Sequence, residues 1–195
     1  MKADEFIGGS FEWFTGIVKD IDDKENLNRV KVHCLGFYDD IKTADLPWAT
    51  VMMPVTNASI KGNGGNHHLE IGSWVVGFFR DGPSAQDPMI MGSIATQTDG
   101  TQDIPTESSV ENKVYKSKAG HLIEIDNTKD DETLRVTHAK GAVITIDKDN
   151  NLTIANSGNT VLTSIGNIDL ISSANINMNA AGPITITSAT KTTVV

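Results

Sequence analysis

From residue 144 to residue 195, apolar side chains recur with a period of eight residues. Counting every eighth residue from 144, and again from 146, gives fourteen positions, of which twelve are apolar and two are threonines. Residues two apart lie on the same face of a β-strand, so each pair of positions presents one apolar face. We call these apolar positions the octad stripe, and its members are Ile144, Ile146, Leu152, Ile154, Leu162, Ile168, Leu170, Ile176, Met178, Ile184, Ile186 and Val194.

Polar residues follow the same period. The residue between the two members of each pair is mostly Thr, Asn or Asp and faces the opposite way. Pairs such as Gly158-Asn159 and Gly166-Asn167 recur at the same interval, and these residue types tolerate the backbone angles of a sharp turn. A period held through seven repeats indicates a repeat architecture.

A single chain offers only two apolar side chains per strand of this repeat, so the octad stripe needs partners. We expect three chains to wind around one axis as a triple-stranded β-helix, with the stripe inside and the Thr/Asn/Ser face in water. The alternative is an antiparallel meander in which the Gly-Asn pairs form two-residue hairpin turns. The constant strand length favours the intertwined homotrimer, because meander strands normally vary in length.

The first hundred residues predict a compact β domain. Five extended runs alternate with loops rich in Asp, Asn and Gly, and they cover residues 13–20, 29–33, 46–54, 72–80 and 88–94. Five short strands in this space are typical of a Greek-key barrel of the OB type. Helical periodicity is nearly absent, so the predicted class is all-β.

Three segments follow from these patterns. Residues 1–96 are expected to form the OB-type barrel, and residues 139–195 the octad-repeat needle. Residues 97–138 between them contain a polar linker and transitional strands, expected within residues 114–125 and in a run over residues 134–146 that leads into the repeat.

Composition limits the possible partners. The chain carries 16 basic and 25 acidic side chains, a net charge of −9, which opposes binding to nucleic acid or to an anionic membrane surface. No apolar run is long enough for a transmembrane helix, and the acidic start of the chain predicts no secretory signal. Cys34 is the single cysteine and is expected to be a small buried hydrophobe.

Candidate chemical sites are weak. The pair His67-His68 has no further ligands at metal spacing, and the loop at residues 61–65 lacks the Gly-Lys-Ser/Thr ending of a phosphate loop. The acidic residues at positions 20, 22 and 23 do not match a calcium loop and are expected to solvate a turn. We therefore expect no catalytic residue, no cofactor and no metal site.

Two further groups of side chains were considered. Glu124, Asp126 and Glu132 could be imagined as the acid pair of a glycosidase, but they are expected in short exposed strands and turns rather than in a cleft. The tryptophans at positions 13, 48 and 74 are expected to pack the barrel rather than to stack bases.

Several short stretches resemble the amino-terminal OB domain of central spike proteins from contractile-tailed phages and related bacterial injection systems. Their order and spacing carry the resemblance, and they lie at residues 13–20 (WFTGIVKD), 28–32 (NRVKV), 46–49 (LPWA), 72–79 (GSWVVGFF) and 88–92 (PMIMG). The octad half resembles the triple-stranded β-helix needle of the same family. Asn28 stands where the family usually has Gly, and Asn tolerates the same turn.

This resemblance implies a structural role without enzyme activity. The barrel would anchor the homotrimer on a baseplate hub protein, and the needle would pierce the target cell envelope when the tail sheath contracts. The implied location is the baseplate of a virion tail, or an equivalent injection particle, made in the bacterial cytoplasm. About forty residues separate the barrel from the repeat, too few for the lysozyme domain that some phage spikes carry there.

The resemblance also has an implication for the carboxyl-terminal tip of the needle. Some needles end in a His-x-His motif that binds iron, whereas this sequence ends on Val194 and Val195, so a separate capping protein is expected at these two residues. Two other functions stay open from the sequence. One is an OB-fold binding module for an oligosaccharide or another ligand, and the other is a component of a cell-wall hydrolase.

Overall fold

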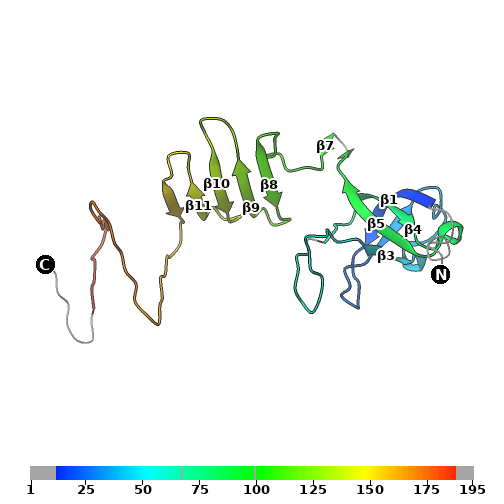
Figure 1. Cartoon of the computed structure of the whole chain (residues 1–195), viewed down its shortest axis with the longest axis horizontal. Coiled ribbons are helices and arrows are strands. Elements are labelled where there is room, and N and C mark those ends of the chain that lie inside the picture. The colour runs from blue at the N-terminus through cyan, green and yellow to red at the C-terminus, as the bar shows by residue number, and fades with distance from the viewer. Residues whose placement is uncertain (1–11, 67, 99, 188–195) are drawn as a thin grey trace.

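The computed structural model describes residues 12–66, 68–98 and 100–187 of the 195-residue chain. A barrel and an open antiparallel sheet follow one another along an elongated molecule (Figure 1). The helices among these residues are two short 3-10 turns, Thr43–Asp45 and Gly82–Ser84. No helix among the described residues is long and apolar enough to cross a membrane. The prediction of an all-β protein is confirmed.

The barrel is closed by five strands in the order β1-β2-β3-β5-β4. Their bounds are Glu12–Asp20 (β1), Val30–Cys34 (β2), Trp48–Val51 (β3), Trp74–Phe79 (β4) and Pro88–Ile94 (β5). Strand β1 pairs antiparallel with both β2 and β4, while β3 and β5 pair in parallel and complete the closure. The expected five-stranded OB-type barrel is therefore confirmed.

The alternation of the barrel strands explains the core. In β1 and β4, every second side chain points inward, so Phe14, Val18, Val75 and Phe79 are buried. Gly77 allows the strands to approach closely, since a Cβ atom there would lie 2.2 Å from the carbonyl oxygen of Met89. The Tyr38 hydroxyl donates a hydrogen bond to the Ala85 carbonyl and ties two loops across the core.

The second sheet is a meander of five consecutive antiparallel strands. Its strands are Asn112–Lys116 (β8), Leu122–Asp126 (β9), Thr133–Thr137 (β10), Val143–Ile146 (β11) and Leu152–Ala155 (β12). The boundary drawn from the sequence between residues 138 and 139 falls in the turn between β10 and β11, inside this sheet. The strands before the octad repeat alternate like those within it, and they pair with them in the same sheet.

The segment between barrel and sheet is ordered by polar contacts. It contains a small hairpin, Gln97–Thr98 (β6) and Thr101–Gln102 (β7). The backbone N–H and the hydroxyl of Thr96 both donate to Asp103 Oδ2, at 2.8 and 2.5 Å, and close the base of this hairpin. Farther along, Lys116 Nζ lies 2.6 Å from Glu107 Oε1 and fastens the linker to β8.

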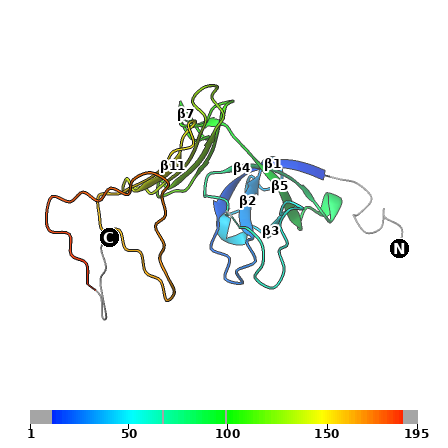
Figure 2. The ribbon, with the colours of Figure 1, turned by 60° about the vertical axis from the view of Figure 1, so that its left-hand side comes forward.

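Beyond β12 the chain makes no strand pairing of its own over residues 156–187. In Figure 2 this segment leaves the sheet and runs on alone in wide bends. It carries the octad-stripe residues from Leu162 to Ile186, and each of them is at least 52% exposed in the single chain.

Candidate functional site

One face of the β8–β12 sheet is apolar across all five strands and open to solvent. One row of directly opposed residues consists of Tyr115, Ile123, Val136, Ile144 and Ile154. The second row consists of Lys113, Ile125, Leu134, Ile146 and Leu152. The apolar side chains of both rows are 38% to 66% exposed. We call this surface the apolar sheet face; a sheet face of this kind normally packs on another layer.

The apolar sheet face contains the first four members of the octad stripe. Ile144 and Ile146 lie on β11, and they are directly opposed to Ile154 and Leu152 on β12. The stripe therefore continues an apolar surface that begins earlier in the chain. The members from Leu162 to Ile186 lie in the segment without strands, while Val194 and Val195 are outside the described residues.

The octad period does not cover the earlier part of this face. Strand β8 contributes Tyr115 to it. Strand β9 contributes Ile123 and Ile125, and β10 contributes Leu134 and Val136, so the two apolar residues of each strand again stand two apart. These residues do not follow the period of eight, because the turns here are longer and the repeat widens to ten or eleven residues. Alternation within each strand was the signal that could have found them.

The opposite face of the sheet is mixed, with Val114 and Leu122 beside polar residues, and Glu124 on this face is only 7% exposed. Asn112 Nδ2 donates to Glu124 Oε1 at 3.3 Å, and Arg135 Nη1 lies 3.6 Å from Oε2. The expectation that Glu124 lies in an exposed strand is wrong, because β9 lies between β8 and β10 and this side chain packs between theirs. A carboxylate with both oxygens engaged in this way contributes to structure.

Asp126 and Glu132, the other two candidates for the acid pair, take part in turns. Asp126 Oδ1 accepts both the N–H and the hydroxyl of Thr128, at 2.9 and 2.6 Å, and the Thr128 hydroxyl lowers the pKa of Asp126. Glu132 accepts a hydrogen bond from the Asp130 N–H at 3.4 Å. Glu124, Asp126 and Glu132 therefore have local partners, and the arrangement offers no basis for glycosidase chemistry.

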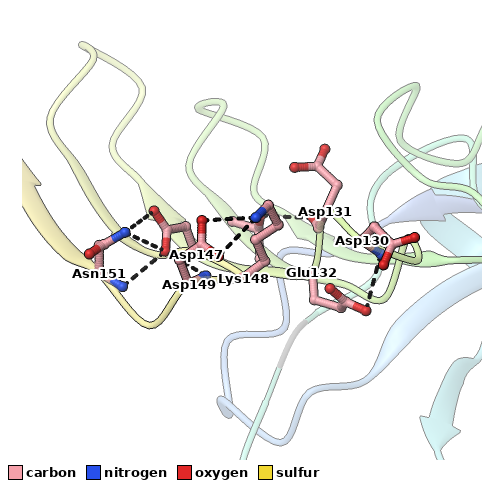
Figure 3. A network of polar contacts seen from close by, with 8 residues as sticks. Asp130, Asp131, Glu132, Asp147, Lys148, Asp149 and Asn151 are labelled. Atoms are coloured by element: carbon pink, nitrogen blue, oxygen red, sulfur yellow. Dashed lines mark hydrogen bonds and ion pairs between the residues drawn. The ribbon is translucent and has the colours of Figure 1, made fainter.

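Acidic residues gather where the β9–β10 and β11–β12 turns lie near each other (Figure 3). Asp147 accepts hydrogen bonds from the backbone and side chain of Asn151, and the side-chain bond lowers the pKa of Asp147. Lys148 Nζ lies 2.8 Å from Asp149. Within the described ranges, no three His, Cys, Asp or Glu side chains are placed to hold a metal ion. These acids are turn-forming groups.

The remaining sequence candidates also have structural roles. Cys34 is fully buried, and burial raises the pKa of its thiol to about 12, so it is not a reactive thiolate at neutral pH. His67 lies outside the described residues, and His68 is exposed in a loop. The Lys61–Gly65 region is held as a loop by hydrogen bonds between Asn57 and Gly65.

Asp23 does more than solvate a turn. Its carboxylate accepts hydrogen bonds from Arg29 Nε and Nη2, at 3.1 and 2.7 Å, and from the backbone N–H of Leu27 at 3.0 Å. These bonds fold the loop between β1 and β2, in which Asn26 and Asn28 both have positive φ. The Asp23 side chain is 5% exposed, so it satisfies the turn with its own hydrogen bonds, and Arg29 adds an ion pair that the sequence did not predict.

The three tryptophans lie on the outside of the barrel. The inward positions beside them are taken by Phe14, Ala49 and Val75, so alternation turns the tryptophans outward. Trp48 is covered by the cationic groups of Arg29 and Lys31, which lie 5.7 and 5.2 Å from its ring centre. The expectation that the tryptophans pack the barrel does not hold for its core, because other residues of the strands occupy the inward positions; Trp13 packs on Phe78 at the outer surface.

Comparison with known proteins identifies relatives for the barrel and beyond. The sequence model of a family described as the Gp5 N-terminal OB domain matches residues 31–169. Protein Gp5 of Vibrio phage KVP40 (isolate Vibrio parahaemolyticus/Japan/Matsuzaki/1991) is 39% identical over 92 residues, which cover 42% of this chain and 21% of that protein. The pre-baseplate central spike protein Gp5 of Enterobacteria phage T4 is 34% identical over 87 residues, covering 40% of this chain and 15% of that protein. The aligned part is thus less than a quarter of either relative.

Proposed function

The chain belongs to the family of the Gp5 N-terminal OB domain, and from this membership we propose that it is a structural component of a tail baseplate, the central spike of a contractile injection machine. One relative is named as a pre-baseplate central spike protein, which supports this assignment. The observation that carries the proposal is the apolar sheet face, which follows the barrel directly and continues into the octad stripe. Its apolar side chains are 38% to 66% exposed in the single chain, as expected for one part of a symmetric assembly.

The assembly we propose is a homotrimer. Three copies of the apolar sheet face around one axis would bury its two rows, and the octad stripe beyond would continue as an intertwined triple-stranded β-helix. Edge strand β12 supports this arrangement, because its outer backbone groups have no strand partner within the described chain and can pair with another copy. The segment at residues 156–187 would then gain from its neighbours the strand pairing that it lacks alone.

The mechanical role follows from the properties of such a trimer. Continuous backbone hydrogen bonding between chains resists compression and separation, since many bonds must break together. From residue 150 onward the only charged side chains are Asp169 and Lys191, so the outer surface would be polar and nearly uncharged. We propose that this needle transmits the thrust of sheath contraction to the target cell envelope.

Two protein partners complete the proposal. The barrel end would attach to a baseplate hub protein, which places the needle on the tail axis. The second partner is a capping protein with β edges, which would contact Val194 and Val195 of the three copies. Deleting residues 191–195 should abolish co-purification of that cap and leave the trimer intact.

The proposed location can be tested on assembled particles. Tails are purified from cells that make the machine, labelled with antibody against the barrel, and imaged by electron microscopy, with copy number measured by mass spectrometry. The proposal expects three copies per tail, on the axis at the baseplate end. If the chain is absent from the purified particles, the proposal is refuted.

A further inference from the structure

The outside of the barrel carries an apolar surface of its own on β1, β4 and β5. The outward residues are directly opposed across these strands: Trp13, Phe78 and Met89 form one row, and Ile17, Trp74 and Ile94 form another. Between them lie Thr15, Val76 and Gly92. Trp13 is 54% exposed and Ile94 is 37% exposed. An apolar patch of this extent on a small domain is typical of an interaction surface.

A series of adjoining depressions leads from this surface to the sheet. The first, of about 600 Å³, is lined by Trp74 and Ile94 of the barrel together with Ile71 and Ile104. The next, of about 890 Å³, shares Ile71 and Ile104 with the first and extends to Tyr115 on β8. Tyr115 therefore borders both the linker and the sheet.

The series continues along the apolar sheet face. The third depression, of about 370 Å³, contains Tyr115, Ile123 and Val136. The fourth, of about 250 Å³, shares Val136 and reaches Ile144 and Ile154. Each depression shares lining residues with the next, from strand β4 of the barrel to strand β12 of the sheet, and we call this series of depressions the long groove.

We propose that the long groove seats a neighbouring copy of this chain, so that the copies contact one another along the barrel and the linker as well as along the sheet and the needle. This inference depends on the proposed trimer. Its sheet half is the surface that the copies would cover there, and the barrel half continues it without a break. Three chains joined through their needles would hold one another's barrels at high effective concentration, which favours contact through adjoining apolar surfaces.

Polar contacts connect the barrel end of the long groove with its sheet end. Lys118, in the turn after β8, lies 2.8 Å from Glu70 of the barrel loop and bridges the second depression. The Thr96–Asp103 and Glu107–Lys116 contacts order the linker that forms its wall. A preformed surface loses less conformational entropy when a partner binds.

Photocrosslinking of the full-length chain tests the inference. A benzophenone amino acid is placed at Ile104, which is 47% exposed in the groove, and in a control at Val55, which is fully exposed outside it. We expect interchain crosslinks from position 104 that map to the barrel or linker of another copy. The control position 55 should give no such crosslink. Ile71→Arg in the crosslinking chain should reduce the yield from position 104.

Light scattering on the same samples separates the possible failures. A trimer without interchain crosslinks from position 104 overturns the long-groove inference and leaves the proposed spike intact. A monomer overturns both. In purified tails, crosslinks from position 104 to a different protein, with none to this chain, would show that another baseplate component occupies the groove, and the inference would be wrong.

Discussion

Ile144 on β11 lies directly opposite Ile154 on β12, on the same face of the sheet as Val136 on β10. The two isoleucines come from successive octads, and the antiparallel pairing sets the first member of one apolar pair opposite the second member of the next. Thr145 and Thr153 are opposed in the same way on the other face. This register defines which side of the repeat faces the proposed trimer axis.

Replacing Ile144 with Asp should therefore dissociate the trimer. Three carboxylates would be brought toward the axis without partners, at a cost of several kcal/mol per trimer. Thr145→Asp introduces the same charge one residue away on the opposite face and should leave the trimer intact. Sedimentation velocity of both variants measures the difference.

The same contrast applies farther along the repeat. Ile168→Asp and Leu170→Asp should act like Ile144→Asp, and Thr185→Asp should be nearly silent. Equal behaviour of the stripe and off-stripe variants would contradict the assigned register.

Gly77→Ala should destabilise the barrel by about 1–3 kcal/mol through overpacking. A Cβ atom at this position would lie 2.2 Å from the Met89 carbonyl oxygen and 2.7 Å from Phe14 Cζ. Gly92→Ala on the neighbouring strand β5 is the matched control because a Cβ atom there meets nothing within 4 Å. Urea unfolding followed by tryptophan fluorescence compares them; equal stability would show that the strands do not approach as closely as described.

Asp23 should make the barrel sensitive to acid. The Arg29 side chain holds the pKa of the Asp23 carboxyl well below its usual range. Because the folded pKa is depressed, the stabilisation is present above the unfolded pKa of about 3.9 and is lost as the pH falls toward the folded pKa. Asp23→Asn should lower the stability at pH 7 and flatten its decrease on acidification.

Asp22→Asn is the control for this pH dependence, because the Asp22 side chain is 72% exposed and pairs only with the exposed Lys24 among the described ion pairs. Thermal unfolding from pH 7 to pH 3 measures all three proteins. If Asp22→Asn and Asp23→Asn give the same profile, Asp23 has no special role.

The purified chain should not degrade peptidoglycan. Glu124, the most buried carboxylate of the acid group considered, is engaged by Asn112 and Arg135. Glu124→Gln should therefore lower the stability of the sheet without changing any lytic activity. A zymogram in which the wild-type band clears peptidoglycan and the Glu124→Gln band does not would contradict this prediction.

The barrel was predictable because its strands alternate cleanly. Phe14, Val18, Val75 and Phe79 stand at every second position, and short polar loops separate the runs. The outward tryptophans were placed wrongly, since propensity favours burial of large aromatic residues and does not report which side of a strand is already filled. Only the register of β1, β4 and β5 shows that Trp13 and Trp74 lie on the outer surface.

The candidate site was predictable in its repetitive half only. A fixed period identified Ile144 to Ile154, whereas Tyr115 to Val136 belong to strands joined by turns of unequal length. The burial of Glu124 depends on two neighbouring strands, so it could not be read from local sequence. The role of Asp23 likewise depends on Arg29, six residues away, folding back across a loop.

The central claim is that three copies of this chain form one spike, and the mass of the purified full-length protein in solution tests it most directly. Multi-angle light scattering at micromolar concentration should give a single species of three times the chain mass of 21.0 kDa. A monodisperse species of 21.0 kDa under the same conditions would contradict the account.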